Sequence, residues 1–289
     1  MNILVTGSNG QLGSDMRDIS GTYTNDTFHF TDVAELDITN RAAIHKFMTL
    51  HNIQCIINSA AYTAVDKAES EPEAAYQINK TAVQYLAEAA LTHNALMVQV
   101  STDYVFDGNS NRPYTERDEV NPQSVYGASK LAGEQVMIAS GVNGIIVRTS
   151  WLYSSYGNNF VKTMMRLAGE KGSLRVIADQ SGTPTYSRDL AKAILDIIPQ
   201  IKDTDRAEIF HYSNAGETNW YEFAVAITSM AGIPCTVNPI TTSDYPTAAK
   251  RPQNSILSKQ KISERFGISL PQWKDSLSDC IQKLLTPQF

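Results

Sequence analysis

Tyr126 and Lys130 are the residues whose types and spacing most clearly indicate chemistry. They lie four positions apart, so on a helix both side chains leave from one face, about one turn from each other. An ammonium held near a phenol favours the phenolate and lowers a pKa that is ordinarily about 10. A tyrosine in this setting exchanges a proton with a developing alkoxide near neutral pH. The pair therefore predicts reduction of a carbonyl or oxidation of an alcohol.

Thr102 is expected to assist the same reaction. It follows an apolar run at residues 96–100 that is typical of a buried strand. From the carboxyl end of that strand, its hydroxyl is expected to hydrogen-bond the same substrate oxygen. A tyrosine and a lysine four residues apart are common in helices, so the interpretation depends on a second motif.

That second motif is the glycine-rich segment at residues 6–13 (TGSNGQLG). It follows a short apolar strand and precedes a predicted helix, so its glycines allow a tight turn and close approach to a pyrophosphate at the helix N-terminus. The spacing is Gly-x-x-Gly-x-x-Gly, which differs from the usual dinucleotide fingerprint. A glycine-rich turn without a ligand is the alternative, and the Tyr126–Lys130 pair favours the dinucleotide site.

Composition excludes several classes of protein. The chain of 289 residues has 24 basic and 30 acidic residues and a formal net charge of −6, without the basic stripe that nucleic-acid binding needs. No apolar run approaches the ~20 residues that span a bilayer, and the start of the chain does not resemble a signal peptide. We therefore expect a cytoplasmic protein that binds neither membranes nor nucleic acids.

Cysteine and histidine usage agrees with that expectation. The cysteines follow no pairing motif and are expected to be buried in a reducing compartment. No histidine has ligand spacing with cysteine or acidic residues, so we predict no metal site and activity that survives chelation. The sequence leaves the oligomeric state open, a homodimer included. The cysteines are Cys55, Cys235 and Cys280.

Strand and helix patterns alternate through the first two-thirds of the chain. This alternation predicts an α/β fold, a Rossmann-type doubly wound parallel sheet whose ligands bind at the carboxyl ends of the strands. Strands are expected at 2–6, 27–31, 53–58, 95–100, 143–148 and 174–178. Helices are expected at 11–20, 40–52, 73–93, 125–140, 159–171, 187–200, 219–232, 259–266 and 271–285.

The chain is expected to have two interleaved parts. Residues 1–178 form the predicted dinucleotide-binding part with the catalytic residues, and residues 179–289 form a smaller, mostly helical substrate-binding region. Residues 234–256 contain several prolines and are expected to be irregular. The long polar segment 102–124 is predicted to be a functional loop, with disorder as the alternative.

Several sequence strings resemble the extended short-chain dehydrogenase/reductase superfamily and, more narrowly, the dTDP-4-dehydrorhamnose reductases. The resemblance runs nearly end to end. The Tyr-Lys and glycine motifs specify only the superfamily, whereas the strings at 101–108 and 148–151 are narrower. The strings are VTGSNGQLG (5–13), NSAAYT (58–63), STDYVFDG (101–108), YGASKLAGE (126–134), RTSWLY (148–153), NNF (158–160), DQSGTPT (179–185) and RPQNS (251–255).

The resemblance implies reduction of the C4 ketone of dTDP-4-dehydro-L-rhamnose to dTDP-L-rhamnose by NADPH or NADH, with Thr102, Tyr126 and Lys130 as the catalytic residues. Tyr126 and Lys130 would also contact the cofactor. The other implied cofactor-binding residues are Gly7, Gly10, Gln11, Leu12, Gly13, Asp32, Asp37, Ile38, Ala60, Ala61 and Tyr62. The implied substrate-binding residues are Thr102, Asp103, Tyr104, Trp151 and Arg251.

Some of these residues have simpler interpretations. In the simpler interpretation, Trp151 only fills the core, and Arg251 only forms an ion pair at the surface. Asn79 either supports the site or is an ordinary exposed helix residue. Asp32 lies nineteen positions beyond Gly13, where a carboxylate accepts from a ribose 2′-hydroxyl and repels a 2′-phosphate. No arginine adjoins it in the sequence, which predicts measurable use of NADH.

Three other functions are alternatives to reduction. Related dehydratases place Asp-Glu after the threonine, whereas here Asp103 is followed by Tyr104, which counts against a dehydratase. Nucleotide-sugar epimerases share the Tyr-Lys pair and stay open. The chain also resembles the regulatory β-subunits of methionine adenosyltransferase, which bind a nucleotide without turnover. Trp151 within RTSW suits a sugar pocket and favours the reductase.

Overall fold

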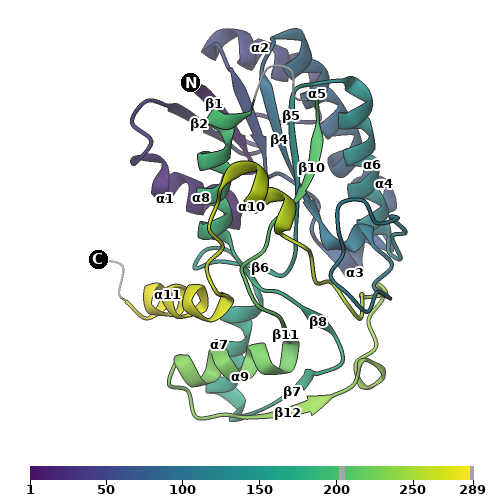
Figure 1. The fold of residues 1–289 in the computed structure, drawn as a ribbon, viewed down its shortest axis with the longest axis vertical. Helices are drawn as coiled ribbons and strands as arrows, with labels where there is room; N and C mark the ends of the chain where they lie inside the picture. The colour runs from purple at the N-terminus through teal and green to yellow at the C-terminus, as the bar shows by residue number, and fades with distance from the viewer. Residues whose placement is uncertain (202–205, 287–289) are drawn as a thin grey trace.

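A six-stranded sheet forms the centre of the computed structural model, which describes residues 1–201 and 206–286 (Figure 1). The strand order is β10-β5-β4-β3-β1-β2, and each strand pair described in this sheet is parallel. The predicted Rossmann-type parallel sheet is thereby confirmed. The strands are β1 (Asn2–Thr6), β2 (Thr27–Thr31), β3 (Cys55–Asn58), β4 (Leu96–Thr102), β5 (Gly144–Thr149) and β10 (Glu208–His211).

Helices cover both faces of the sheet because successive side chains of a buried strand point to opposite faces. On β1, Ile3 and Val5 pack with α1 (Gln11–Ser20), α8 (Ser187–Ile197) and α10 (Gln260–Phe266). The intervening Leu4 belongs to the second core, on the other face. The helices of that face are α2 (Arg41–His51), α5 (Ala82–Thr92) and α6 (Val125–Ser140).

A smaller region lies below the sheet in Figure 1 and has its own apolar core. Its helices are α7 (Phe160–Lys171), α9 (Trp220–Met230) and α11 (Trp273–Leu285). Two parallel strands, β7 (Ser173–Ile177) and β12 (Thr236–Ile240), pack beside them. Short pairs join β6 (Leu152–Tyr153) to β9 (Thr185–Tyr186) and β8 (Ser181–Gly182) to β11 (Thr218–Asn219).

Two expectations for this region were wrong. The strand expected at 174–178 was assigned to the large sheet, but β7 lies outside it because β10 occupies the place beside β5. The segment expected to be irregular contains β12. Both α8 and β10 come from beyond residue 178, yet both belong to the sheet and its cover. Residues 202–205 and 287–289 of the predicted second part lie outside the described residues.

The helix expected at 73–93 is interrupted. It consists of α4 (Pro72–Tyr76), a π-helical turn η1 (Gln77–Thr81) and α5. Such turns are frequent at functional sites. The remaining short helices are α3 (Val65–Ala68), η2 (Asp103–Val105), η3 (Ile198–Gln200) and η4 (Thr242–Asp244).

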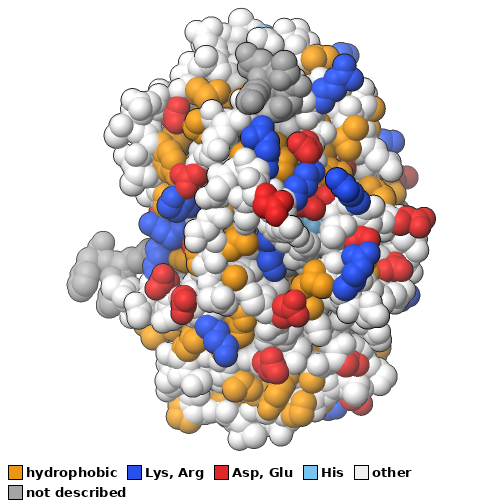
Figure 2. Space-filling view, viewed as in Figure 1, with side chains coloured by type: hydrophobic (Ala, Val, Ile, Leu, Met, Phe, Trp, Pro, Cys, Tyr) orange, Lys and Arg blue, Asp and Glu red, His pale blue; other side chains and the backbone are white. Residues whose placement is uncertain are grey.

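Acidic and basic side chains are interspersed on the face shown in Figure 2. Within residues 1–201 and 206–286, no helix combines the length and the apolar character needed to cross a membrane. The same residues contain no group of three or more His, Cys, Asp or Glu side chains arranged to hold a metal ion. Cys55 and Cys280 are buried as expected, whereas Cys235 is partly exposed, and all three thiols are free.

Candidate active site

A cavity of about 780 Å³ opens at the carboxyl ends of β1 to β5. Parallel strands bring these ends to one edge of the sheet, so residues distant in sequence meet there. All of the predicted site residues line the cavity except Gly13 and Arg251. The predicted residues that line it are Gly7, Gly10, Gln11, Leu12, Asp32, Asp37, Ile38, Ala60, Ala61, Tyr62, Thr102, Asp103, Tyr104, Tyr126, Lys130 and Trp151.

The glycine-rich loop has the shape that a pyrophosphate requires. Gly7 has a φ of 65°, and a Cβ at this position would lie 2.6 Å from the backbone nitrogen of Ala60. Gly13 packs inward, because its Cβ would lie 2.4 Å from the Cα of Ser8. No side chain caps the start of α1 at Gly10, which leaves the helix N-terminus suited to an anion. The loop therefore fits a dinucleotide.

Asp32 lies at the end of β2 and closes the other side of this loop. Its carboxylate accepts from the backbone nitrogens of Asn9 at 3.0 Å and Val33 at 2.8 Å. Although no arginine adjoins Asp32 in sequence, Arg17 reaches the same loop from α1. The Arg17 guanidinium donates to the Ser8 hydroxyl at 3.0 Å and lies 4.5 Å from the centre of the Phe30 ring.

The structure brings the three predicted catalytic residues together. Tyr126 and Lys130 lie on α6, and Thr102 ends β4. The Lys130 ammonium donates a hydrogen bond of 2.6 Å to the carbonyl oxygen of Val100. The Thr102 hydroxyl hydrogen-bonds the Tyr126 phenol. All three side chains line the same cavity.

The pKa of Tyr126 is shifted in the direction opposite to the expectation. Desolvation raises the pKa of this phenol well above its usual value, and the charge of Asp103 adds to the shift, while the Thr102 hydrogen bond opposes it. Burial lowers the pKa of Lys130 to about 8, against the opposing effect of Glu134. Tyr126 is therefore protonated near neutral pH, which is the state that a proton donor in a reduction needs.

Close packing fixes α6 against its neighbours. A Cβ at Gly127 would lie 2.2 Å from the carbonyl oxygen of Tyr104, and one at Gly133 would lie 2.1 Å from that of Asn79. The Asn79 side chain is buried and accepts from the Tyr62 backbone nitrogen at 2.9 Å. It also donates to the Tyr62 carbonyl and to the Ser129 hydroxyl. Asn79 thus supports the site and is not an exposed helix residue.

A buried ion pair lies beneath the catalytic residues. Arg148 on β5 contacts Glu134 on α6 through two hydrogen bonds of 2.8 and 2.6 Å. Glu134 also accepts a 2.5 Å hydrogen bond from Ser101, next to Thr102. Both charged residues are at most 2% exposed, and buried charges need such pairing. The strings at 126–134 and 148–153 contain this pair, yet neither string indicates that its members meet.

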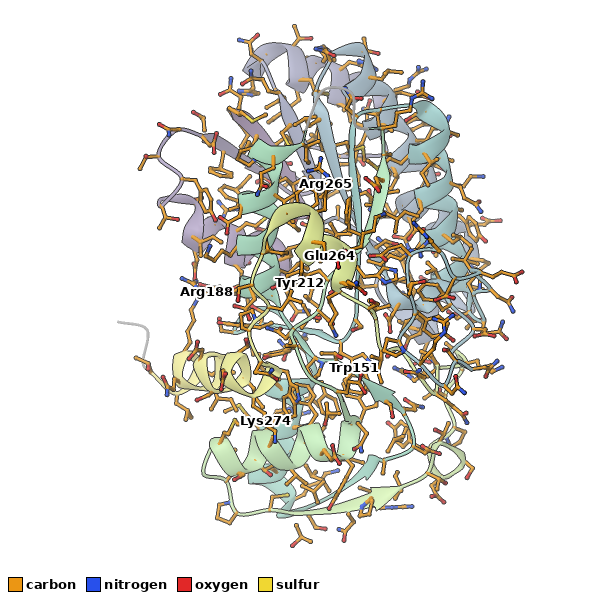
Figure 3. All side chains as sticks on the ribbon, viewed as in Figure 1. Trp151, Arg188, Tyr212, Glu264, Arg265 and Lys274 are labelled. Atoms are coloured by element: carbon orange, nitrogen blue, oxygen red, sulfur yellow. The ribbon has the colours of Figure 1, made fainter. Side chains whose placement is uncertain are left out.

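Trp151 borders the cavity from below the sheet (Figure 3). Its φ of 50° is in the left-handed region, which is unusual for a bulky residue. Its ring stacks on Trp220 with centroids 3.6 Å apart and an interplanar angle of 13°. A Cβ at Gly182 would lie 2.5 Å from the Trp151 ring. Trp151 is therefore both packed and placed at the cavity, and sequence reasoning missed the contribution of Trp220.

Arg251 is held away from the cavity lining. Its guanidinium forms a 2.8 Å ion pair with Asp66, the bond predicted by the simpler interpretation. Arg251 also interacts with the Tyr104 phenol, whose pKa burial raises to about 12. Its predicted contact with a substrate diphosphate stays a prediction.

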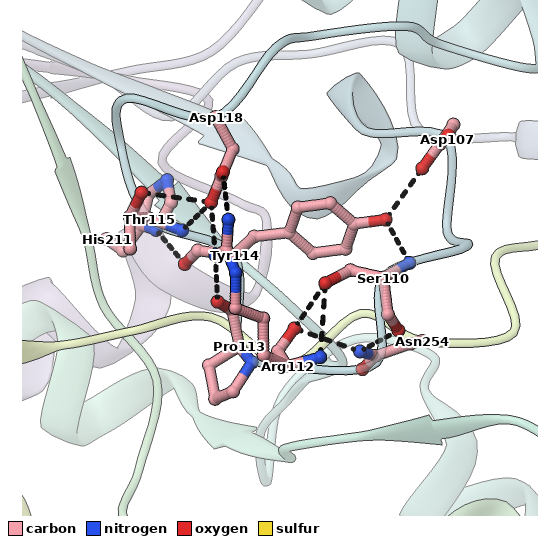
Figure 4. A network of polar contacts seen from close by, with 9 residues as sticks. All are labelled: Asp107, Ser110, Arg112, Pro113, Tyr114, Thr115, Asp118, His211 and Asn254. Atoms are coloured by element: carbon pink, nitrogen blue, oxygen red, sulfur yellow. Dashed lines mark hydrogen bonds and ion pairs between the residues drawn. The ribbon is translucent and has the colours of Figure 1, made fainter.

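The segment at 102–124 is ordered by polar contacts (Figure 4). The Tyr114 hydroxyl donates to Asp107 at 2.7 Å and accepts from the Ser110 backbone nitrogen at 3.0 Å. Asn254 donates to the Ser110 carbonyl at 2.8 Å, so the loop is joined to the segment that follows Arg251. The disorder considered from the sequence is not observed in these residues.

Sequence reasoning missed thirteen cavity-lining residues. Many of them end a predicted strand or immediately follow one, so the ends of the predicted strands could have identified them. They are Val33, Leu36, Ser59, Thr63, Val65, Ile78, Val100, Ser101, Thr149, Ser150, Leu152, Gly157 and Asn158.

Known proteins resemble this chain over its whole length. Residues 1–286 match the family model described as RmlD substrate binding domain. A dTDP-4-dehydrorhamnose reductase of Aggregatibacter actinomycetemcomitans is 44% identical, across 96% of this chain and 97% of the relative.

Solved structures resemble the fold equally well. The crystal structure of a dTDP-4-dehydrorhamnose reductase from Clostridium acetobutylicum has a TM-score of 0.93 and 44% identity, covering 99% of this chain and 100% of its own. A Bacillus anthracis dTDP-4-dehydrorhamnose reductase in complex with NADP has a TM-score of 0.93 and 38% identity, and the match covers 98% of this chain and 99% of that chain. The cavity, its glycine loop and these end-to-end similarities agree, and the chain belongs to the dTDP-4-dehydrorhamnose reductase family.

Proposed function

We propose that this protein reduces the C4 ketone of dTDP-4-dehydro-L-rhamnose to dTDP-L-rhamnose, using NADPH or NADH. The observation that carries the proposal is the meeting of Thr102, Tyr126 and Lys130 in one cavity with the glycine loop. The identities of 44% and 38% to named reductases support the substrate, and the relative crystallised with NADP supports the cofactor class.

The protein's part in the reaction is to orient the reactants and supply a proton. When bound, the nicotinamide supplies the hydride that reduces the C4 carbon. Tyr126 donates its phenolic proton to the carbonyl oxygen as negative charge develops there. Lys130 holds a positive charge beside this position and binds the nicotinamide ribose. Thr102 contributes a second hydroxyl at the same end of the cavity, and a hydrogen bond from it to the developing alkoxide would stabilise the negative charge.

The remaining site residues are assigned to the two ligands. The loop at Gly7, Gly10 and Gln11 would bind the pyrophosphate, with Asp32 facing the adenosine ribose. Asp37 and Ile38 would lie beside the adenine, and Ala60 to Tyr62 would line the nicotinamide side. Trp151 would border the sugar, and Arg251 would bind the diphosphate after exchanging its contact with Asp66. Residues 1–178 and 179–289 would supply mainly the cofactor and substrate sides, respectively.

The test is oxidation of NADPH and NADH by the purified protein with dTDP-, UDP- and GDP-linked 4-keto sugars. We expect turnover with the dTDP-4-keto sugar, and rhamnose as the sugar recovered after hydrolysis. A protein that binds cofactor but turns over none of these substrates would contradict the proposal and favour a regulatory nucleotide-binding subunit. Release of a C4 or C5 epimer without net NAD(P)H oxidation would favour an epimerase.

We also propose a cytoplasmic location, because three free thiols and a nucleotide-sugar substrate suit that compartment. Fractionation of cells with an antibody to the chain tests this. A homodimer is the assembly to be tested first, by light scattering of the purified protein with and without a divalent cation.

A further inference from the structure

The Thr102 hydroxyl is already fully engaged within the protein. A threonine hydroxyl has one hydrogen to donate and two lone pairs that accept. Its hydrogen goes to Oδ1 of Asp103 at 2.9 Å. Its oxygen accepts from the Tyr104 backbone nitrogen at 3.2 Å and is hydrogen-bonded to the Tyr126 phenol. In this arrangement, Thr102 has no hydrogen left for a substrate oxygen.

Asp103 controls that arrangement and is itself enclosed. It is 2% exposed, and its Oδ2 atom is buried without a well-formed hydrogen bond. The neighbouring Ser255 hydroxyl donates to the Ser181 carbonyl at 3.3 Å. Desolvation raises the pKa of Asp103 to about 7, while the hydrogen bond from Thr102 opposes the shift. The carboxyl group therefore changes its protonation state near neutral pH.

The charged groups around Asp103 come from several elements. Tyr104 follows it in η2, and Tyr126 faces it from α6; both phenols have raised pKa values and stay neutral near pH 7. Arg251 and Asp66 lie beyond Tyr104 and neutralise each other in an ion pair. Lys130, also on α6, donates to the carbonyl oxygen of Val100, and Glu134 is paired with Arg148. Each of these charges has a partner other than Asp103.

We propose that Asp103 is a positioning residue whose proton sets the direction of the Thr102 hydrogen. When Asp103 is ionised, it accepts that hydrogen, as in the structure. When Asp103 is protonated, its O–H donates to the Thr102 oxygen in place of the Tyr126 phenol, which turns to the substrate ketone, and the Thr102 hydrogen is free to point toward the same ketone. Two donors, Thr102 and Tyr126, then meet the developing alkoxide. This inference rests on the proposed reduction and deepens its mechanism.

The experiment is the pH profile of kcat/KM for the dTDP-4-keto sugar at saturating NADPH, from pH 6 to 9. In the wild type, we expect kcat/KM to fall about ten- to hundredfold as pH rises through about 7, the range for losing one hydrogen bond to a charged group. Asp103→Asn cannot titrate, so this fall disappears. Thr102→Val also lacks it, since Asp103 acts only through Thr102.

Two controls separate this effect from other titrations. Asp107→Asn alters a nearby carboxylate whose pKa is lowered by Asn109 and Tyr114, and the fall near pH 7 should persist. A second decline near pH 8 belongs to Lys130 and should remain in Asp103→Asn. The inference is overturned if kcat/KM of the wild type does not fall near pH 7. It is also overturned if that fall persists in Asp103→Asn or Thr102→Val.

Infrared difference spectra of the cofactor-free wild type provide a measurement that is independent of turnover. A protonated-carboxyl band should vanish as pH rises through 7, and Asp103→Asn should lack this band. If circular dichroism shows that Asp103→Asn is unfolded, the test rests on the pH profile of Thr102→Val and on the infrared spectra of the wild type. Absence of the protonated-carboxyl band from the wild-type spectra overturns the inference. A wild type that shows the band but reduces no sugar nucleotide contradicts the proposed function, not the titration of Asp103.

Discussion

The Lys130 ammonium donates a hydrogen bond of 2.6 Å to the Val100 carbonyl oxygen, so a buried cation is joined directly to the strand that ends in Thr102. The same carbonyl also accepts from the Gln99 side chain at 2.8 Å. Val100 would therefore keep a partner if the lysine were replaced. The main consequence of Lys130 for stability is the desolvation that lowers its pKa to about 8.

Lys130→Met is expected to stabilise the cofactor-free protein while reducing kcat and weakening cofactor binding. The folded pKa of about 8 lies below the ordinary 10.5, so charging Lys130 disfavours folding by roughly 3–4 kcal/mol at ~1.4 kcal/mol per pKa unit. Between these two values the unfolded chain binds more protons, so wild-type stability rises with pH. The advantage of the variant is thus largest below pH 8 and shrinks towards pH 10.5.

Thermal unfolding at pH 7 and pH 10 measures this effect. Lys171→Met, at the exposed end of α7, is the matched control, and its melting temperature should differ little from that of the wild type at either pH. A melting temperature of Lys130→Met below that of the wild type at pH 7 would contradict the prediction.

Tyr126→Phe is expected to lower kcat by at least about a hundredfold, because general acid catalysis is typically worth ~10²–10⁴-fold. Removing one phenolic oxygen should leave cofactor affinity and folding nearly unchanged. Steady-state NADPH oxidation and fluorescence titration of the cofactor measure the two effects separately. A variant with more than half of the wild-type kcat would remove Tyr126 from the mechanism.

Gly182→Ala is expected to raise KM for the sugar nucleotide without changing cofactor affinity. Its methyl group would lie 2.5 Å from the Trp151 ring, which cannot retreat because Trp220 stacks on it. We expect a rise of about tenfold in KM, equivalent to ~1.4 kcal/mol. Gly169→Ala, where nothing lies within 4 Å of the added carbon, is the control and should keep the wild-type KM.

Arg17→Gln is expected to weaken NADPH binding about tenfold, on the scale of ~1.4 kcal/mol for one screened charge contact, and to leave NADH binding nearly unchanged. Arg17 lies at the loop that Asp32 closes, where its charge offsets the carboxylate's repulsion of a 2′-phosphate. We expect the wild type to bind and use both cofactors. Isothermal titration with each cofactor tests this, with the exposed Arg166→Gln as control. If the variant binds NADPH and NADH with equally reduced affinity, Arg17 does not recognise the 2′-phosphate.

Turnover is expected to survive dialysis against EDTA. Tyr126 and Thr102 provide the donors for the carbonyl oxygen, so the proposed reaction needs no Lewis acid. The rate before and after dialysis is compared beside circular dichroism. Loss of turnover in a protein that stays folded would require a metal in the mechanism.

Local patterns were sufficient for much of the fold and the cavity. The apolar run before Gly7 and the glycine spacing predict β1, the turn and α1 with matching bounds. Tyr126 and Lys130 meet at the cavity because helical spacing alone places both on one face. The position of Thr102 at the cavity was predicted because it follows an apolar run typical of a strand, and strands of a parallel sheet end at the ligand edge. In each case, one short segment contains the whole signal.

Features that depend on distant contacts were not predicted. β10 has only four residues, and its place is set by the free edge of β5. Trp220 begins a helix whose sequence gives no sign that its ring stacks on Trp151. The raised pKa of Tyr126 was missed because desolvation depends on the closed cavity, whereas the spacing shows only that Lys130 is near. Arg17 was overlooked because its approach to the Asp32 loop is tertiary.

The position of β10 has a consequence for how the protein is made. About sixty residues separate the end of β5 from the end of β10, so at ~5–20 residues per second a ribosome needs roughly 3–12 s to synthesise them. During that interval, the backbone groups at the edge of β5 have no neighbouring strand, and such edges pair readily with other chains. Nascent chains that stall between β5 and β10 therefore present an unpaired strand edge to chaperones or to aggregation.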